Sequence, residues 1–461
     1  MTRRNVILTL ILLSVLAFTA RAGLVIYLHA WRTPNAMEHR SIAYQLVNGR
    51  GFSFGDWGYF GPTSVQSPPF PFLLAGMYKI FGDTPPTDGS LTDANVAYFA
   101  IMMINALAGA ALVWLTYSMA RTLGGSVLTA LLAAATVSLW PSQVYAARHV
   151  QAISLITAAL AASIILFYRA MQTGRLRPWI GYCIVATLAT LTEPVFLPAL
   201  AISGVLTLTW RGLPIKARRR NAAFLILAVL TFIGPWTARN IIVHGKFVPI
   251  KSSVWVNIWK GNNEFATGTD RLAPSEREKS TAKKNLWSDD EFVESSLDRD
   301  RQYDMLDPSQ RSRLHNQPEL VREAVFKEFT LHWITTHPQE YVRLCVIRVI
   351  KTIGVDWDNP KSYNIVYIIS RYALLALTIV GTFVALRQKW SLLFPAIIIG
   401  TSLLTYALTV TAARFSIPFE PIQLCLAAAA IAIPFERRFR ESSSRAKHSQ
   451  EKPQLSAAPQ I

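Results

Sequence analysis

A polar stretch behind the first apolar run holds two carboxylates whose side chains could take up a proton. Residues 31–82 read as a short amphipathic helix, a glycine turn at Gly49-Arg50-Gly51 and a helix that starts at a proline. Glu38 lies near the start of this stretch, and Asp56 follows the glycine turn. A carboxylate within hydrogen-bond reach of a hydroxyl group can act as its general base. Glu38 also has a plain interpretation, a solvated charge beside Arg40.

Basic side chains at the ends of apolar runs form a second set of candidates. The forked guanidinium of arginine matches the oxygens of a phosphate group. The other interpretation is that these side chains extend along apolar surface to the membrane interface. It also applies to Arg21 inside the first apolar run, which we expect to reach outward. The candidates are Arg148, His149, Arg239 and Arg414.

The composition places these residues in a membrane protein. The chain has 461 residues, of which 51% are hydrophobic and only 16% are charged, whereas soluble domains contain about a quarter charged residues. Several apolar runs approach or exceed the roughly 20 residues that cross a bilayer as a helix. They are Val6–Tyr27, Val96–Met119, Val127–Ala147, Ala152–Tyr168, Tyr363–Leu386, Leu392–Ala412 and Ile417–Ile433. The first run is longer than the apolar core of a signal peptide, so we interpret it as a retained anchor.

The net charge of +18 invites a nucleic-acid interpretation, but its distribution fits membrane topology better. Lysine and arginine gather in residues 169–177, in residues 211–220 and in the tail after residue 436. Excess positive charge beside spans marks cytoplasmic loops. Both termini are therefore predicted to lie in the cytoplasm, and no nucleic-acid partner is predicted.

Glu193-Pro194 interrupts the apolar segment between Trp179 and Trp210. Proline breaks the hydrogen-bond ladder of a helix and disfavours the helical conformation at the residue before it. We therefore predict two short spans that turn near Glu193, which leaves both basic clusters on one side. With a further span at Ala222–Trp236, the chain is predicted to be an all-α membrane protein with about ten transmembrane helices.

Two outer segments are expected between these spans. The first, residues 31–95, should contain interfacial helices, one of them Phe70–Phe81 lying on the membrane. The second, residues 237–362, is predicted to be a long mixed loop, with short β-prone stretches over Arg239–Gly268 followed by helices. One of these, Tyr341–Ile353, is cationic and amphipathic, which favours an interfacial anchor over a substrate-binding role.

The resulting domain organisation has four parts. The basic tail is too poor in apolar residues to bury a core and is predicted to be disordered. The parts are a transmembrane module at 1–236, a large outer loop at 237–362, C-terminal transmembrane helices at 363–435 and a cytoplasmic tail at 436–461.

The spacing of cysteine and histidine does not indicate a metal or redox site. The 3 cysteines lie far apart in the sequence, and a helix would not align His332 with His337. The acidic run Asp289-Asp290-Glu291 reads as a solvated helix start. No cofactor is predicted, and the sequence leaves a divalent metal open.

Short motifs are spread over most of the chain. They are Ile42-Ala43, Gly49-Arg-Gly-Phe-Ser53, Gly61-Pro-Thr63, Pro68-Pro-Phe-Pro71, Lys79-Ile-Phe-Gly82, Pro235-Trp236, Arg239-Asn240, Phe247-Val-Pro-Ile250, Gly261-Asn-Asn263, His337-Pro338 and Ala413-Arg-Phe-Ser-Ile-Pro418. With these motifs the chain resembles the GT-C superfamily of integral membrane glycosyltransferases, most of all bacterial relatives of aminoarabinose transferase and protein O-mannosyltransferase. Together the motifs are more specific to the fold than to an activity.

This resemblance implies a polyprenyl-phosphate-linked sugar as the donor and a lipid, glycan or protein acceptor at the outer face. It implies inversion at the sugar carbon, with an acid of the first outer loop as general base. Cationic groups would stabilise the phosphate that leaves. The location it implies is a bacterial inner membrane with a periplasmic large loop.

The chain departs from the family pattern at the expected base. Counting back from Ile42-Ala43, the family's acid falls at the position held by Asn35, and a neutral amide cannot accept the proton. Either Glu38, about one helical turn later, has taken the role, or Asp56 supplies it, or the chain does not transfer sugar in the usual way. Asn35 is kept as a substrate-binding candidate. A second acid that is frequent in the family at the position of Gln151 is also missing.

Two other classes of function stay open. A transporter or lipid flippase would be expected to show matching inverted halves, and the sequence shows none. A non-catalytic relative that binds a lipid-linked sugar is the third possibility.

Overall fold

The computed structural model describes residues 2–32, 34, 36–82, 96–272, 303 and 305–450. Over these residues the chain is helical apart from loops and one short hairpin, which confirms the predicted all-α class. The elements are α1 (Arg3–Tyr27), α2 (Met37–Val47), β1 (Ser53–Asp56), β2 (Tyr59–Pro62), α3 (Pro69–Phe81), α4 (Val96–Leu123), α5 (Val127–Ser138), α6 (Pro141–Ala146), α7 (Ile153–Thr173), α8 (Leu176–Thr192), η1 (Pro194–Phe196), α9 (Leu197–Thr209), α10 (Ile215–Phe232), α11 (Gly234–His244), α12 (Val254–Gly261), α15 (Pro308–Leu314), α16 (Glu319–Thr336), α17 (Pro338–Ile353), η2 (Pro360–Tyr363), α18 (Ile365–Arg387), α19 (Leu393–Leu408), η3 (Ala413–Phe419) and α20 (Glu420–Gln450).

Five segments of the described chain are long and apolar enough to cross a membrane. They are α1, α4, α7, α18 and Ala413–Glu436, which joins η3 to the first part of α20. Helices α10 and α11 would form a sixth span, bent by 41° at their junction. An integral membrane protein is thereby confirmed.

The predicted count of about ten spans is larger than the number of helices that meet this test. Shorter apolar helices occupy other predicted spans, namely α5, the segment Pro194–Thr209 and α19. Helix α8, with 17 residues, occupies the span predicted at Trp179–Thr192. Each is shorter than the roughly 20 residues that a helical span needs, so the count of ten stays a prediction.

The prediction of one continuous span at Val127–Ala147 is wrong. Helix α5 ends at Ser138, and α6 starts at Pro141 after the non-helical residues Leu139 and Trp140. Proline suits the first position of a new helix, because its missing N–H would have no partner there. The break leaves the carbonyl groups at the end of α5 without partners inside their own helix.

Arg21 supplies those partners and does not reach outward as predicted. It is 1% exposed, and its guanidinium donates to the carbonyl oxygens of Ser138 at 2.7 Å and Val137 at 3.2 Å. Gly109 of α4 leaves room for it, since a Cβ there would lie 2.1 Å from Arg21 Nε. A cation at a helix C-terminus is also favoured by the helix dipole.

Replacing Arg21 by methionine should therefore destabilise the protein. Two buried carbonyl oxygens would lose their donor, and an unsatisfied buried polar group costs about 1–3 kcal/mol. We expect a clear drop in the melting temperature of the detergent-purified protein. Arg32→Met, at an exposed position beyond the end of α1, is the matched control, and equal melting of the two variants would contradict the capping role.

The break at Glu193 lies where the sequence predicts it. Helix α8 ends at Thr192, Glu193 is extended with φ −129° and ψ 97°, and η1 begins at Pro194. The steric effect of a proline on the preceding residue accounts for this conformation.

The first outer segment contains the predicted helix, glycine turn and proline-started helix. Gly49 and Gly51 have φ values of 74° and 70°, which other residues adopt only at a steric cost. The β1–β2 hairpin between them and α3 is not predicted from the sequence. Its turn residues, Trp57 and Gly58, both have positive φ, as a tight hairpin turn requires. Tryptophan is not a residue that usually indicates such a turn.

Among the described residues of the large loop the regular elements are helices, so the predicted mixed character of this loop is not confirmed. The stretch Arg239–Gly268, predicted to be β-prone, contains the end of α11 and the whole of α12. Trp259 of α12 packs on Phe326 of α16, with 5.1 Å between ring centroids. The same β-prone residues thus serve as one face of a helix, because packing overrides a local strand preference.

Helix α17 differs from the predicted interfacial anchor at Arg348. This side chain is fully buried and donates to the carbonyl oxygens of Gly261 at 3.1 Å and Thr409 at 2.6 Å and to the side chain of Asn262 at 2.8 Å. It therefore ties the end of α12 to the end of α19. Arg343 on the same helix is exposed and pairs with Glu340 at its surface.

The tail also differs from its prediction. Helix α20 continues past residue 436 to Gln450, where the composition predicts a disordered segment. Residues 451–461 lie outside the described residues.

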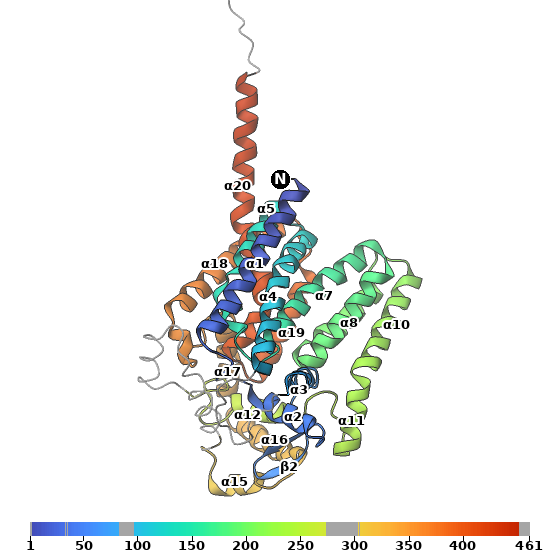
Figure 1. The fold of residues 1–461 in the computed structure, drawn as a ribbon, viewed down its shortest axis with the longest axis vertical. Coiled ribbons are helices and arrows are strands. Elements are labelled where there is room, and N and C mark those ends of the chain that lie inside the picture. Colours follow the sequence, from blue (N-terminus) through green and yellow to red (C-terminus); the bar gives the residue numbers. More distant parts are fainter. Residues whose placement is uncertain are drawn as a thin grey trace, which may run out of the picture.

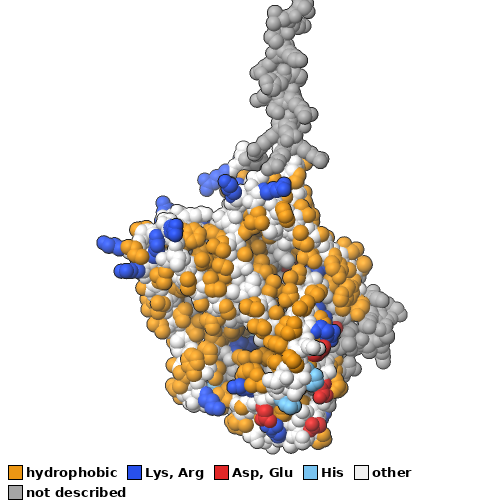
Figure 2. Space-filling model, turned by 180° about the vertical axis from the view of Figure 1, so that it is seen from behind, with side chains coloured by type: hydrophobic (Ala, Val, Ile, Leu, Met, Phe, Trp, Pro, Cys, Tyr) orange, Lys and Arg blue, Asp and Glu red, His pale blue; other side chains and the backbone are white. Residues whose placement is uncertain are grey.

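The helices form a bundle with a small lobe at one end (Figure 1). The small lobe consists of α2, the β1–β2 hairpin, α12, α15 and α16. Figure 1 shows the N-terminus and the far part of α20 at the opposite end of the molecule. On the face seen in Figure 2, hydrophobic side chains cover the flank, and lysine and arginine gather near the end that carries α20. This distribution suits a bundle whose flank contacts lipid.

Candidate active site

Glu38 lies in the first turn of α2. Its Oε2 accepts a hydrogen bond of 2.9 Å from the side-chain amide of Gln66, which lies between β2 and α3. The later part of the first outer segment thus folds back and orients this carboxylate. Gln66 is not predicted from the sequence as a site residue, although it lies among the proline-rich motifs.

Asp56 is the last residue of β1. Its backbone carbonyl accepts a 3.0 Å hydrogen bond from Arg322 of α16, and its carboxylate lies 3.8 Å from the same guanidinium. Burial raises the pKa of the Asp56 carboxyl, Arg322 lowers it, and the charge of Glu38 adds to the increase. The two candidate carboxylates therefore lie within electrostatic reach of each other.

Lys260, in the last turn of α12, interacts with both acids. Its ammonium lies 5.4 Å from the ring centroid of Tyr303. Burial alone would lower the pKa of Lys260, but Tyr303, Glu38 and Asp270 raise it, and the net shift is upward. The surrounding acidic groups thus outweigh desolvation and keep this lysine positively charged.

Arg414 joins this cluster through Asp270. Its guanidinium lies 3.4 Å from the Asp270 carboxylate, and 32% of its side-chain surface is exposed. Asp270 in turn acts on Lys260. An arginine with accessible donors can bind an anion such as a phosphate.

Arg239 supports the first outer segment. Its guanidinium donates to the backbone carbonyls of Thr63 at 2.6 Å and Phe52 at 2.9 Å, and it lies 4.9 Å from the ring of Trp236. These contacts hold the two ends of the hairpin, so Arg239 positions the segment that carries Asp56.

Arg148 and His149 lie beyond the end of α6. Arg148 is buried and its guanidinium lies 5.1 Å from the ring of Tyr145. His149 contacts the same ring, and its backbone carbonyl accepts a 2.8 Å bond from Asn105 of α4. These contacts connect the pair to α4 and α6. Asn35 lies outside the described residues.

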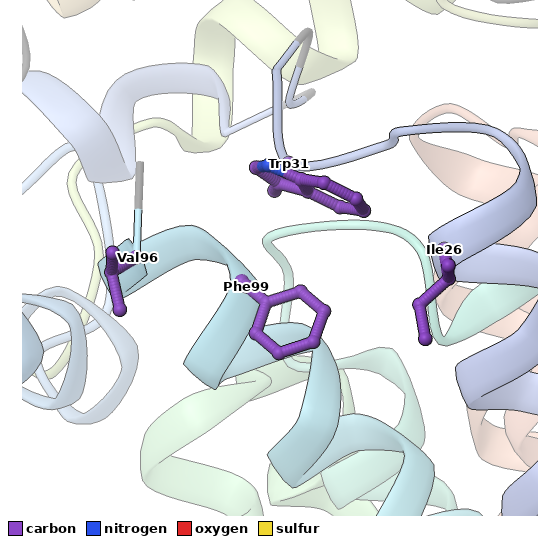
Figure 3. Close-up of a pocket in the computed structure, with 4 residues that line it drawn as sticks. All are labelled: Ile26, Trp31, Val96 and Phe99. Atoms are coloured by element: carbon purple, nitrogen blue, oxygen red, sulfur yellow. The ribbon is translucent and has the colours of Figure 1, made fainter. Parts of the chain in front are cut away.

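An apolar pocket of about 310 Å³ opens at the ends of α1 and α4 (Figure 3). Its lining consists of Ile26, Trp31, Val96 and Phe99. Trp31 packs edge-on against Phe99, with 5.3 Å between ring centroids. These side chains cannot transfer a proton or bind a charged group. The pocket can therefore accommodate hydrocarbon, but it cannot carry out a reaction.

One part of the chain matches a known family. A family model described as dolichyl-phosphate-mannose-protein mannosyltransferase matches residues 65–192. This stretch runs from the residues just before α3 to the end of α8. No curated protein matches the chain.

Solved structures share the fold over nearly the whole chain. The apo oligosaccharyltransferase of Archaeoglobus fulgidus has a TM-score of 0.54 at 14% identity, covering 96% of this chain and 52% of that one. The Archaeoglobus fulgidus oligosaccharyltransferase AglB, in complex with an inhibitory peptide and a dolichol-phosphate, has a TM-score of 0.50 at 13% identity, covering 98% and 52%. The chain therefore shares its fold with these oligosaccharyltransferases.

The chain spans about half the length of those oligosaccharyltransferases. ArnT from Cupriavidus metallidurans, bound to undecaprenyl phosphate, matches with a TM-score of only 0.37 at 11% identity, over 89% of this chain and 77% of that one. The match to the oligosaccharyltransferases shows the fold alone, so the activity has to be argued from the site.

The described site contains acidic and cationic side chains. Among the residues that the structure describes, no three His, Cys, Asp or Glu side chains are arranged to hold a metal ion. The acidic run Asp289-Asp290-Glu291 lies outside those residues. The cluster around Glu38 and Asp56 combines acids with cations. Its central cation, Lys260, is not predicted from the sequence, although it directly precedes the Gly261-Asn-Asn263 motif.

Proposed function

We propose that this chain is a GT-C glycosyltransferase that transfers a sugar from a polyprenyl-phosphate carrier to a hydroxyl group of an acceptor at the outer face of a bacterial inner membrane. The observation that carries this proposal is the association of Glu38 and Asp56 with Lys260. A base for the acceptor and a cation for the phosphate are the two groups that such a transfer needs.

Glu38 is the proposed general base. As the acceptor oxygen attacks the anomeric carbon, Glu38 takes the hydroxyl proton. The bond from that carbon to the phosphate oxygen breaks, and its electron pair leaves with the polyprenyl phosphate. Lys260 and Arg414 stabilise the negative charge that develops there. A single displacement of this kind inverts the configuration at the sugar carbon.

The nature of the donor is supported by the comparisons. The matching family model is named for a dolichyl-phosphate-linked sugar, and the AglB structure contains a dolichol-phosphate. The acceptor class is open among lipids, glycans and proteins, since no described contact selects one of them.

The proposed orientation places both termini in the cytoplasm and the small lobe in the periplasm. Its support is the charge distribution: the basic segments 169–177 and 211–220 and the basic tail all belong on one side by the positive-inside rule. The N-terminus and α20 lie at the end of the bundle away from the small lobe (Figure 1).

The direct test is sugar transfer by the purified protein in proteoliposomes. A panel of polyprenyl-phosphate sugars is offered with lipid, glycan and peptide acceptors. We expect release of polyprenyl phosphate together with a product of inverted anomeric configuration. Movement of the lipid-linked sugar across the bilayer without release would instead identify a flippase.

The replacement of the family's acid by Asn35 favours one other candidate, a non-catalytic relative that binds a lipid-linked sugar. Saturable binding of the donor without any turnover, over the whole acceptor panel, would establish that function in place of the transferase.

A further inference from the structure

The first two turns of α16 contact three separate segments around the proposed site. Arg322 and Glu323 follow Glu319 by three and four residues, so both lie on the same side of the helix as Glu319. They are only 9%, 9% and 8% exposed. Burying charged side chains is costly unless each is satisfied, so their partners show what this turn holds in place.

Glu319 holds the chain between the hairpin and α3. Its carboxylate accepts a 3.0 Å bond from the backbone N–H of Ser64 and a bond from the hydroxyl of Thr63. It also accepts a bond from the hydroxyl of Ser252, just before α12. Gln66, which orients Glu38, follows Ser64 by two residues. A shift of Ser64 would therefore move the donor that orients Glu38.

Arg322 holds the tip of the hairpin. One nitrogen donates 3.0 Å bonds to the backbone carbonyls of Asp56 and Gln317, and another lies 3.8 Å from the Asp56 carboxylate. These contacts fix the backbone of Asp56 and also place a positive charge beside its side chain.

Glu323 holds the start of α12. Its carboxylate accepts bonds from the backbone N–H groups of Trp255 at 2.7 Å and Val256 at 3.3 Å. These N–H groups lie in the first helical turn and have no partner within α12. The last turn of this short helix carries Lys260, so its position depends on where α12 begins.

We infer that the start of α16, Glu319–Glu323, is the positioning element of the active site, which sets Glu38, Asp56 and Lys260 relative to one another. Glu319, Arg322 and Glu323 are positioning residues, because they act through Gln66, the hairpin backbone and α12. This inference rests on the proposed function. The physical reason is that one short helical segment makes all three connections, so a shift of this segment displaces all three groups together.

The charge of Glu323 offers a way to test this element. Burial raises the pKa of Glu323 to about 7, the N–H groups of α12 lower it, Glu319 raises it and Arg322 lowers it. Lys327, one turn further on, lies 5.4 Å from the ring of Trp255. Above pH 7 the carboxylate is ionised and is the stronger acceptor for the start of α12.

The protonation of Glu323 then affects fold stability and the positioning of α12 in opposite ways. A rise in pH strengthens the hold of Glu323 on α12 but lowers the stability of the fold. The folded-state pKa of Glu323 lies above that of an ordinary glutamate, so the protonated form favours the fold. That contribution to stability is lost as pH rises towards 7. Glu323→Gln removes the buried charge and should melt no lower than the wild type at pH 8, although it holds α12 less well.

We expect Glu323→Gln to lower kcat/KM about 10-fold at pH 8. At pH 6 the wild type is itself largely protonated at Glu323, so the two proteins should differ by less than about two-fold. Glu319→Gln should lower kcat about 10-fold or more with the KM for the donor nearly unchanged, because it misaligns the base. Glu328→Gln, at an exposed position on the same helix, should match the wild type at both pH values.

Hydrogen exchange separates a failure of this inference from a failure of the proposed function. We expect faster amide exchange at residues 254–258 in Glu323→Gln and at residues 63–66 in Glu319→Gln, with Glu328→Gln unchanged. These shifts would support the positioning element even in a protein that transfers no sugar. Ser252→Ala, a milder loosening of Glu319, should change exchange in the same direction if Glu319→Gln does not fold.

Two results would overturn the inference. One is exchange at both segments in Glu319→Gln and Glu323→Gln that equals exchange in Glu328→Gln. The other is a ratio of wild-type to Glu323→Gln activity that is the same at pH 6 and pH 8, because a merely structural loss would not follow the charge of Glu323.

Discussion

Replacing Glu38 by glutamine should reduce sugar transfer by about 10²–10⁴-fold, the usual contribution of a general base. Glutamine has the same shape and can still accept the hydrogen bond from Gln66 through its carbonyl oxygen. Its amide cannot take up the proton of the attacking hydroxyl. We expect kcat to fall while the KM for the donor changes little, measured as polyprenyl phosphate released in proteoliposomes.

Two matched variants decide which acid acts. Asp56→Asn keeps the backbone contact with Arg322, so a comparable loss in this variant, with Glu38→Gln active, would assign the base to Asp56. Glu264→Gln changes an exposed acid that follows α12 and should leave transfer unchanged. Full activity in Glu38→Gln would remove Glu38 from the mechanism.

Replacing Lys260 by methionine should lower kcat/KM by about 10²–10³-fold, the scale of losing one group that stabilises developing negative charge. Methionine is of similar length but carries no charge. Without the ammonium, the acids Glu38, Asp56 and Asp270 would repel the phosphate of the donor. We therefore expect a higher KM for the donor as well as a lower kcat, measured in the same assay.

Lys260→Arg and Lys246→Met serve as controls for that prediction. Arginine keeps the positive charge, so it should restore part of the lost kcat/KM. Lys246 is an exposed lysine after α11, and its loss should have no effect. If Lys260→Met behaved like Lys246→Met, the phosphate would have to be stabilised by other groups.

Features that depend on neighbouring residues were predictable from the sequence. Hydropathy locates the helices of the bundle. A long apolar segment in lipid folds as a helix, because a helix satisfies its backbone hydrogen bonds within the segment. The break at Glu193 follows from steric effects of Pro194, which act on the residue directly before it. Likewise the turn at Gly49 and Gly51 follows from the conformational freedom of glycine itself.

Predictions failed where a distant segment supplied the partner. Arg21 was expected to reach outward. Instead it donates to the carbonyl oxygens of Val137 and Ser138 at the end of α5, which lie 116 and 117 positions further along the chain. Arg348 was expected at the interface, but it joins α12 to α19. In both cases the hydrogen-bond acceptors of the arginine come from a distant part of the chain and not from water. The local sequence does not reveal such partners.

The sequence alone determined that this is a helical membrane protein and that a carboxylate lies in the first outer segment. It could not show which charges meet. Gln66 reaches Glu38 across 28 residues, and Arg322 reaches Asp56 across 266. The tertiary structure alone brings Lys260 to these acids, because hydropathy and turn propensity act over a few residues, whereas the electrostatics of a site depend on where whole helices pack.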